Sequence, residues 1–236
     1  MRICVRDYPT FLPERPGPGE AHVWVARLDA PPRSVEELVA SLVPEERERG
    51  ERYRLPAVRD QYLRTRGLLR VLMGSYLGVR PESLALTVTA DGKPGLDDGA
   101  LQFNVSHSQG VAAFVVSERE VGIDLEAIRP VPSADGLVER YFSPVECKRY
   151  FALPESLRPV AFLRAWTCKE AVLKGLGCGA RGLDRCVVEV DPRLPPRVLG
   201  LPVGGGVWSL NCWEPAAGFV GAVAVNGTEG AELIRE

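Results

Sequence analysis

Apolar residues recur at three- and four-residue spacing from Val58 to Leu77, which is the period of an amphipathic helix. Gly78 follows the last of them, and a glycine in this place ends a helix because it tolerates the left-handed conformation. A second long helix is expected over residues 162–174, closed by Gly175 and Gly177. These two segments are the longest helices that the pattern predicts.

Two further helices are indicated by their start signals. Ser34 is followed three residues later by Glu37, the spacing of a capping box that opens a short helix. Ser143, Pro144 and Glu146 supply an N-cap, a proline at the first helical position and a carboxylate at the third. We therefore expect a helix that begins near residue 144.

Short runs rich in β-branched and aromatic residues predict strands in both halves of the chain. The runs are 23–28, 84–89, 101–105, 111–117, 121–125, 186–190, 207–213 and 219–225. The polar residues 107–110 separate two of them and are interpreted as the loop of a hairpin. Because each half combines helices with at least three strands, we predict an α+β protein of two similar subdomains, residues 1–120 and 121–236.

The composition is that of an ordinary globular protein, with 45% hydrophobic and 25% charged residues. The formal net charge of -2 argues against a dedicated nucleic-acid binder. No apolar run approaches the roughly 20 residues that span a bilayer, and the N-terminus lacks the pattern of a secretory signal. The six cysteines form no CxxC pair and are expected to be buried, reduced residues, so a cytoplasmic location is predicted.

The segment from Gly122 to Glu126 carries the most informative chemistry. Side chains alternate along a strand, so Asp124 and Glu126 share one face while Ile123 and Leu125 point into the core. Two carboxylates on one face repel each other unless water or a cation lies between them, and oxygen ligands favour Mg²⁺. The alternative interpretation is a solvated strand face.

The predicted helix over residues 162–174 carries two of only four lysines in the chain. Trp166, Glu170 and Lys174 share one face at helical spacing, and the last two could form a surface salt bridge. A lysine ammonium is also suited to a phosphate or to a leaving oxygen. Lys169 lies about 100° around the helix from Glu170, and we expect it to face a partner or solvent.

Two other segments add isolated polar groups. Residues 91–94 have the composition of a turn and contain Lys93. Ser106 and Ser108 flank His107, one of two histidines, at the end of a predicted strand. No G-x-S-x-G segment accompanies them, so a serine hydrolase is disfavoured.

Taken together, four motifs in this order resemble the 4′-phosphopantetheinyl transferase superfamily, in its long, monomeric, surfactin-synthetase-activating type. The motifs are GKP at 92–94, FNVSHS at 103–108, GIDLE at 122–126 and WTCKEAVLK at 166–174. The resemblance implies two α+β halves related by a pseudo-twofold axis, with the active site in the cleft between them. It also implies that the enzyme moves phosphopantetheine from coenzyme A to a serine of an apo carrier protein and releases adenosine 3′,5′-bisphosphate.

The resemblance also implies a role for each matching residue. Asp124, Glu126 and Glu170 match Mg²⁺ ligands, with Mn²⁺ as an alternative, and Glu170 matches a general base acting directly or through water. Lys174 matches the lysine that stabilises the departing phosphate. Lys93, Ser106 and His107 match contacts to the phosphates of coenzyme A, and Arg49, Arg52 and Arg66 match contacts to its 3′-phosphate or adenosine end.

The carrier protein that accepts the group is expected to contact the region that follows the predicted helix over residues 162–174. This region extends from Gly175 to about residue 208. Leu176 and Leu183, with Arg181 and Arg185 nearby, would suit the acidic helix of a carrier protein if the leucines are exposed. The alternative is a solvated loop. The sequence does not distinguish acyl, peptidyl and polyketide carriers.

Two other functions remain as alternatives at this stage. One is a Mg²⁺-dependent hydrolase of coenzyme A or a related nucleotide, which would release product without an acceptor. The other is a non-catalytic module that binds a carrier protein.

Overall fold

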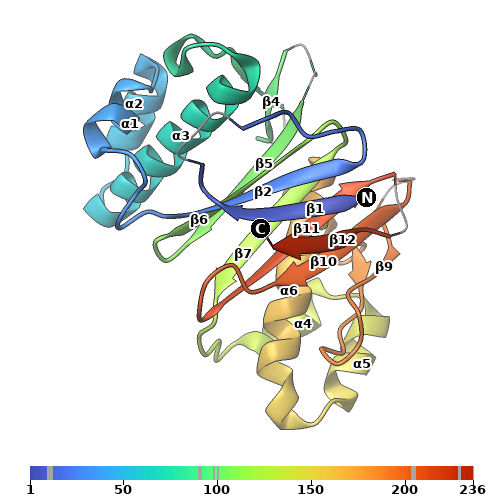
Figure 1. The fold of residues 1–236 in the computed structure, drawn as a ribbon. Coiled ribbons are helices and arrows are strands. Elements are labelled where there is room, and N and C mark those ends of the chain that lie inside the picture. The colour runs from blue at the N-terminus through green and yellow to red at the C-terminus, as the bar shows by residue number, and fades with distance from the viewer. Residues whose placement is uncertain are drawn as a thin grey trace.

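The computed structural model describes residues 1–9, 13–89, 92–97, 99, 101–202, 206–227 and 230–235, without the side chain of residue 180. Two sheets lie at the centre, and helices cover the outer face of each (Figure 1). The predicted α+β class, with small sheets packed against helices, is confirmed. None of the helices in the described ranges is long and apolar enough to cross a membrane.

The first sheet has the strand order β12-β1-β2-β6-β5. Its strands are β1 (Arg2–Asp7), β2 (Glu20–Arg27), β5 (Gln102–Ser108), β6 (Val111–Ser117) and β12 (Glu232–Arg235). The β12, β1 and β2 strands are parallel, whereas β2, β6 and β5 are antiparallel. Helices α1 (Val35–Ala40), α2 (Pro44–Glu51) and α3 (Pro56–Leu77) lie on one side of this sheet (Figure 1).

The second sheet is antiparallel, with the order β10-β11-β7. Its strands are β7 (Val121–Ala127), β10 (Trp208–Trp213) and β11 (Phe219–Asn226). Helix α6 (Arg158–Leu176) packs on its outer face together with α4 (Ala134–Tyr141) and α5 (Pro144–Ala152). The described elements also include two small hairpins, β3 (Leu86–Val88) with β4 (Pro94–Leu96), and β8 (Val187–Val188) with β9 (Val198–Gly200).

Three apolar clusters hold these layers together. One cluster lies between α3 and the first sheet, with Trp24, Leu68 and Phe114 among its members. Another lies between α6 and the second sheet. The third joins the inner faces of the two sheets, where Ile123 of β7 meets Val115 of β6. Val121, Ile123 and Leu125 of β7 belong to this third cluster, whereas Asp124 and Glu126 alternate with them and face away from it, as the alternation of apolar and polar residues predicts.

The C-terminal strand β12 belongs to the first sheet, although it comes from the second half of the chain. Figure 1 shows it beside β1 at the edge of that sheet. The division at residues 120 and 121 and the pseudo-twofold axis stay predictions.

The start signals of α1 and α5 and the stop signals at Gly78 and Gly177 are confirmed. The predicted bounds of the second long helix are wrong, because α6 begins at Arg158 and continues through Gly175 to Leu176. Ser34 and Ser143 each accept a hydrogen bond from the backbone nitrogen three residues later, and both capping boxes are complete. Gly78 ends α3 with a φ of 67°. The predicted loop over residues 107–110 is wrong in extent, because Gln109 and Gly110 alone form the turn, with φ of 41° and 83°. Strands β1 and β12 and helix α4 were not predicted.

Candidate active site

Helix α6 approaches β7 so closely that their main chains touch. A Cβ atom on Gly122 would lie 1.9 Å from the carbonyl oxygen of Ala171 and 2.4 Å from the backbone nitrogen of Gly175. Only glycine fits this position, and its side-chain face on β7 is shared by Asp124 and Glu126. The close approach brings the C-terminal turns of α6 onto the acidic face of β7.

Lys174 reaches from the last turn of α6 to the first carboxylate of β7. Its Nζ donates to Asp124 Oδ1 at 2.5 Å and to Ser106 Oγ at 3.0 Å. Ser106 Oγ in turn donates to Asp124 Oδ1 at 2.8 Å. The ion-pair partner of Lys174 is thus a residue of β7 rather than Glu170 on its own helix. Three elements, β5, β7 and α6, meet at this point.

The other two carboxylates are electrostatically coupled to Asp124. Burial raises the pKa of Glu170, and the charge of Asp124 raises it further, whereas Lys174 lowers it. Burial also raises the pKa of Glu126, again with a contribution from Asp124. Glu126 and Glu170 are therefore harder to ionise than they would be in water, first because they are partly buried and second because the charge of Asp124 repels theirs.

The chemistry of these groups suits a hard cation, although the side chains as placed do not form a closed cage. No group of three His, Cys, Asp or Glu residues within the described ranges is arranged to hold a metal ion. However, Asp124 Oδ2 is buried and makes no hydrogen bond. A buried carboxylate oxygen without a partner costs free energy, and a bound cation would remove that cost. The donor set of three carboxylates fits Mg²⁺ or Mn²⁺.

A cavity of about 540 Å³ adjoins this cluster on the side of the first helices. Arg49, Tyr62, Arg66 and His107 are among the residues that line it, and the Arg49 guanidinium lies 5.6 Å from the centre of the Tyr62 ring. Neighbouring groups desolvate the His107 ring in part and lower its pKa, although the residue is exposed, and the nearby charge of Lys174 lowers the pKa further. The cavity therefore offers two guanidinium groups and a histidine to an anionic ligand.

Glu46 organises the arginines of this cavity and was not predicted from the sequence. It is buried and accepts hydrogen bonds at 2.5 Å from the Nε atoms of both Arg66 and Arg70. The guanidinium groups hold its pKa below the usual value despite burial. The signal that could have identified it is its position three residues after Val43, where a capping glutamate is expected.

Two residues that were predicted to contact coenzyme A, Arg52 and Lys93, do not line this cavity. Arg52 is exposed at the end of α2 and is not part of the cavity lining. Lys93 donates to the carbonyl oxygen of Gly175 at 2.6 Å, and burial lowers its pKa. Lys93 thus ties the β3–β4 hairpin to the end of α6. Asp91 of the same motif lies outside the described residues.

The expectation that Lys169 faces a partner or solvent is wrong. Its side chain is 0% exposed, and its Nζ donates to both carboxylate oxygens of Glu146, at 2.7 and 2.6 Å. It also donates to the carbonyl oxygen of Cys186 at 2.6 Å. The expectation failed because α5 and the chain at the start of β8 cover the face of α6 on which Lys169 lies.

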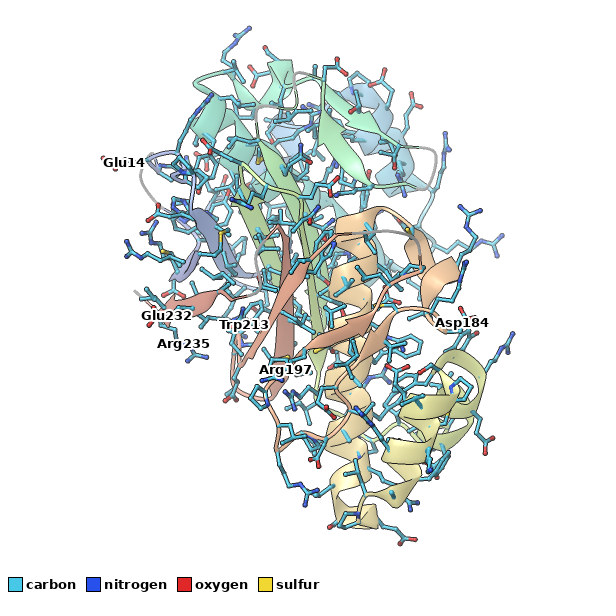
Figure 2. All side chains as sticks on the ribbon, turned by 90° about the vertical axis from the view of Figure 1, so that its right-hand side faces the viewer. Glu14, Asp184, Arg197, Trp213, Glu232 and Arg235 are labelled. Atoms are coloured by element: carbon cyan, nitrogen blue, oxygen red, sulfur yellow. The ribbon has the colours of Figure 1, made fainter. Side chains whose placement is uncertain are left out.

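The expectation of exposed leucines after α6 is also wrong for one residue. Leu183 is 2% exposed and belongs to the core between α6 and the second sheet. Its neighbour Asp184 lies at the surface of the molecule, as Figure 2 shows. Leu176 is partly buried against the same core, whereas Arg181 and Arg185 are exposed. This surface is therefore more polar than the sequence indicates.

Comparison with known proteins gives matches over most of the chain. A family model described as the 4′-phosphopantetheinyl transferase superfamily matches residues 120–223. The chain is 37% identical to the 4′-phosphopantetheinyl transferase HetI of Nostoc sp., over 92% of this chain and 94% of that protein. It is 35% identical to a putative 4′-phosphopantetheinyl transferase of Synechocystis sp., over 69% of this chain and 67% of that protein. A 4′-phosphopantetheinyl transferase of Bacillus subtilis is 28% identical, over 66% of this chain and 70% of that protein.

Proposed function

The chain belongs to the 4′-phosphopantetheinyl transferase superfamily, and we propose that it transfers phosphopantetheine from coenzyme A to a serine of an apo carrier protein. The observation that carries this proposal is the meeting of Ser106, Asp124 and Lys174 beside a cavity lined by arginines and a histidine. A cluster of carboxylates and a lysine next to an anion-binding cavity is suited to phosphoryl-type transfer.

The cavity is the proposed binding site for the nucleotide end of coenzyme A. Arg49 and Arg66 present guanidinium groups that bind phosphate oxygens in a bidentate manner. Glu46 holds the Arg66 side chain in place before any ligand arrives. The lowered pKa of His107 keeps its imidazole neutral near pH 7, so it contributes one hydrogen-bond donor without adding a charge.

Asp124, Glu126 and Glu170 are the residues that would hold Mg²⁺ or Mn²⁺. Bound at these carboxylates, the cation supplies positive charge that offsets the charge of the pyrophosphate. Ser106 and Lys174 fix the orientation of Asp124, which is the most buried member of the set. The close packing at Gly122 keeps Glu170 on the same side of β7 as the other two.

The reaction exchanges one phosphorus–oxygen bond for another. The carrier serine oxygen forms a bond to the β-phosphorus of coenzyme A, and the bond from that phosphorus to the oxygen of the leaving adenosine 3′,5′-bisphosphate breaks. Glu170 takes the serine proton, directly or through a water molecule. Lys174 donates a hydrogen bond to the departing phosphate.

The test is a mass measurement on the acceptor. The protein is incubated with Mg²⁺, coenzyme A and a panel of apo acyl, peptidyl and polyketide carrier proteins. We expect a mass gain equal to one phosphopantetheine group on at least one carrier, and release of adenosine 3′,5′-bisphosphate only when that carrier is present. Release without any carrier would identify a hydrolase instead, and carrier binding that is indifferent to Mg²⁺ and coenzyme A would identify a binding module.

Long monomeric enzymes of the surfactin-synthetase-activating type remain the predicted subclass. The chain spans almost the whole length of the Nostoc relative as one polypeptide with two central sheets. Sedimentation of the purified protein would test this, because a stable oligomer would contradict the predicted monomer.

A further inference from the structure

Strand β7 lies at the edge of the second sheet, so the backbone groups on its outer edge have no strand partner in that sheet. Side chains of β5 satisfy three of its backbone N–H groups. The N–H groups of Ile123, Leu125 and Ala127 donate to Asn104 Oδ1, Ser106 Oγ and Ser108 Oγ, at 3.2, 3.3 and 3.4 Å. We call this row of contacts the polar seam.

The polar seam is regular because of the geometry of strands. Its three β5 residues are separated by two positions, so their side chains share one face of β5. In each of the three contacts the residue number on β7 exceeds that on β5 by 19. Because this difference is constant along the row, β5 and β7 run in the same direction. Side-chain oxygens here replace the carbonyl groups of a neighbouring strand.

Two members of the polar seam also contact the acidic residues of β7. Ser106 Oγ donates to Asp124 Oδ1 at 2.8 Å, and Ser108 Oγ donates to Glu126 Oε2 at 3.1 Å. Each serine therefore accepts from one backbone N–H and donates its single hydroxyl proton to the carboxylate of the preceding residue. The same arrangement is repeated once along the strand pair.

We propose that Ser108 is a positioning residue that sets the orientation of the Glu126 carboxylate for the cation of the transfer reaction. This inference rests on the proposed function, since it concerns a predicted metal ligand. Ser106 has a further contact to Lys174, whereas the described contacts of Ser108 join only Glu126 and the backbone of β7.

Fixing a carboxylate from one side has a direct consequence for cation binding. Glu126 has one oxygen, Oε2, committed to Ser108, and its half-buried side chain has lost much of its rotational freedom. Hydrogen-bond partners of metal ligands typically change metal affinity by about 10–100-fold when they are removed. Ser108 is therefore expected to lower the dissociation constant of the cation without touching it.

Asn104 provides a matched control within the same seam. It accepts a hydrogen bond from the backbone of β7 just as Ser108 does, but the carboxylates at this site are bonded to the two serines. Replacing Asn104 weakens the seam alone, whereas replacing Ser108 weakens the seam and releases Glu126. The two changes thus separate a structural contribution from a positioning one.

The experiment measures binding of Mn²⁺ alone, by the loss of the electron paramagnetic resonance signal of the free ion. We compare the wild type with Ser108→Ala, Ser108→Thr, Asn104→Ala and the pair Ser108→Ala with Glu126→Gln. We expect the dissociation constant to rise about tenfold in Ser108→Ala and to return with threonine, which restores the hydroxyl. Asn104→Ala should keep the wild-type constant, and Ser108→Ala should add nothing once Glu126 is glutamine.

The outcomes separate this inference from the function on which it rests. If the wild type binds no Mn²⁺, the proposed metal site and this inference are both overturned. If the wild type binds and Ser108→Ala binds equally well, the inference alone is overturned. An equal loss in Asn104→Ala also overturns it, because the effect would then be structural. If Ser108→Ala does not fold, Ser108→Cys, with a weaker donor of similar size, carries the same prediction with a smaller rise.

Discussion

Helix α6 carries two lysine–carboxylate pairs, five residues apart, that differ in how completely they are satisfied. Lys169 uses all three hydrogens of its ammonium group, two on Glu146 and one on the Cys186 carbonyl. Glu146 also accepts from the backbone and hydroxyl of Ser143 and from the backbone of Val188. Both side chains are fully buried.

The pair formed by Lys174 and Asp124 is incomplete. Asp124 Oδ2 is buried without a hydrogen-bond partner, and the Lys174 side chain is 30% exposed. The satisfied pair joins α5, α6 and β8 and leaves nothing for a ligand to bind. The incomplete pair keeps an acceptor and an accessible ammonium group for a ligand. The difference teaches that the unsatisfied ion pair, rather than the more buried one, is the better guide to the proposed catalytic end of this helix.

Breaking the satisfied pair should have the largest effect, and it should be an effect on stability. We expect Lys169→Ala to lower the free energy of unfolding by about 3–5 kcal/mol, because it leaves the Glu146 charge buried without a counterion. Urea denaturation measures this. The double variant Lys169→Met with Glu146→Gln removes both charges and should recover most of the loss. Wild-type stability in Lys169→Ala would contradict the distinction between the two pairs.

Breaking the incomplete pair should instead affect catalysis. We expect Lys174→Ala to lower the transfer rate by on the order of 10²-fold, since one donor to the departing phosphate is lost. The free energy of unfolding should fall by less than in Lys169→Ala, because the Lys174 side chain is 30% exposed and water can replace part of its interaction with Asp124. Single-turnover transfer to a carrier and urea denaturation measure the two effects. Lys148→Ala, at an exposed position of α5, is the control and should keep wild-type rates.

A change in the cavity beside the incomplete pair should alter the binding of coenzyme A. Glu46→Gln removes the charge that orients Arg66, and we expect the KM for coenzyme A to rise about tenfold with kcat little changed. Steady-state kinetics with varied coenzyme A measure both constants. Glu48→Gln, an exposed change on the same helix, should leave them at wild-type values. An unchanged KM in Glu46→Gln would show that Arg66 needs no such partner.

The smallest effect concerns the titration of His107. Its pKa is lowered by partial desolvation and by Lys174, so its proton resonances should titrate below the ordinary midpoint of about 6.5. Lys174→Ala should raise that midpoint, because one nearby positive charge is removed. Between the lowered pKa and the unfolded value the unfolded chain binds more protons, so stability falls as the pH falls through this window.

Nuclear magnetic resonance of the wild type and Lys174→Ala follows the histidine directly. Thermal unfolding between pH 5 and 7 should show a shallower pH dependence in His107→Gln, which lacks this titration. A midpoint at or above the ordinary value would contradict the proximity of His107 to Lys174.

The sequence predicted those features that depend on local spacing. The alternation along β7 placed Asp124 and Glu126 on one face, and the helix period placed Glu170 and Lys174 on one side of α6. The capping boxes located the starts of α1 and α5. Each of these features depends on residues that are close in sequence, so the sequence alone is enough to predict it.

Features that depend on distant partners could not be predicted in the same way. The helix period gave the direction of Lys169 but not the fact that Glu146 and Cys186 cover it. From the sequence, Glu46 was recognisable only as a capping residue. Its hydrogen bonds with Arg66 and Arg70 form because α2 packs against α3. The polar seam was hidden because Asn104 and the two serines look like solvent-facing residues until β7 is placed beside them.

The parallel pairing of β12 with β1 has a consequence for how the protein is made. Strand β1 emerges from the ribosome before its neighbour at residues 232–235, which is synthesised about 10–50 s later at ordinary elongation rates. During that interval one edge of β1 stays open, and an open strand edge is a site for pairing with other chains. Nascent chains arrested before residue 232 should therefore associate with a chaperone or with one another more readily than chains that extend past it.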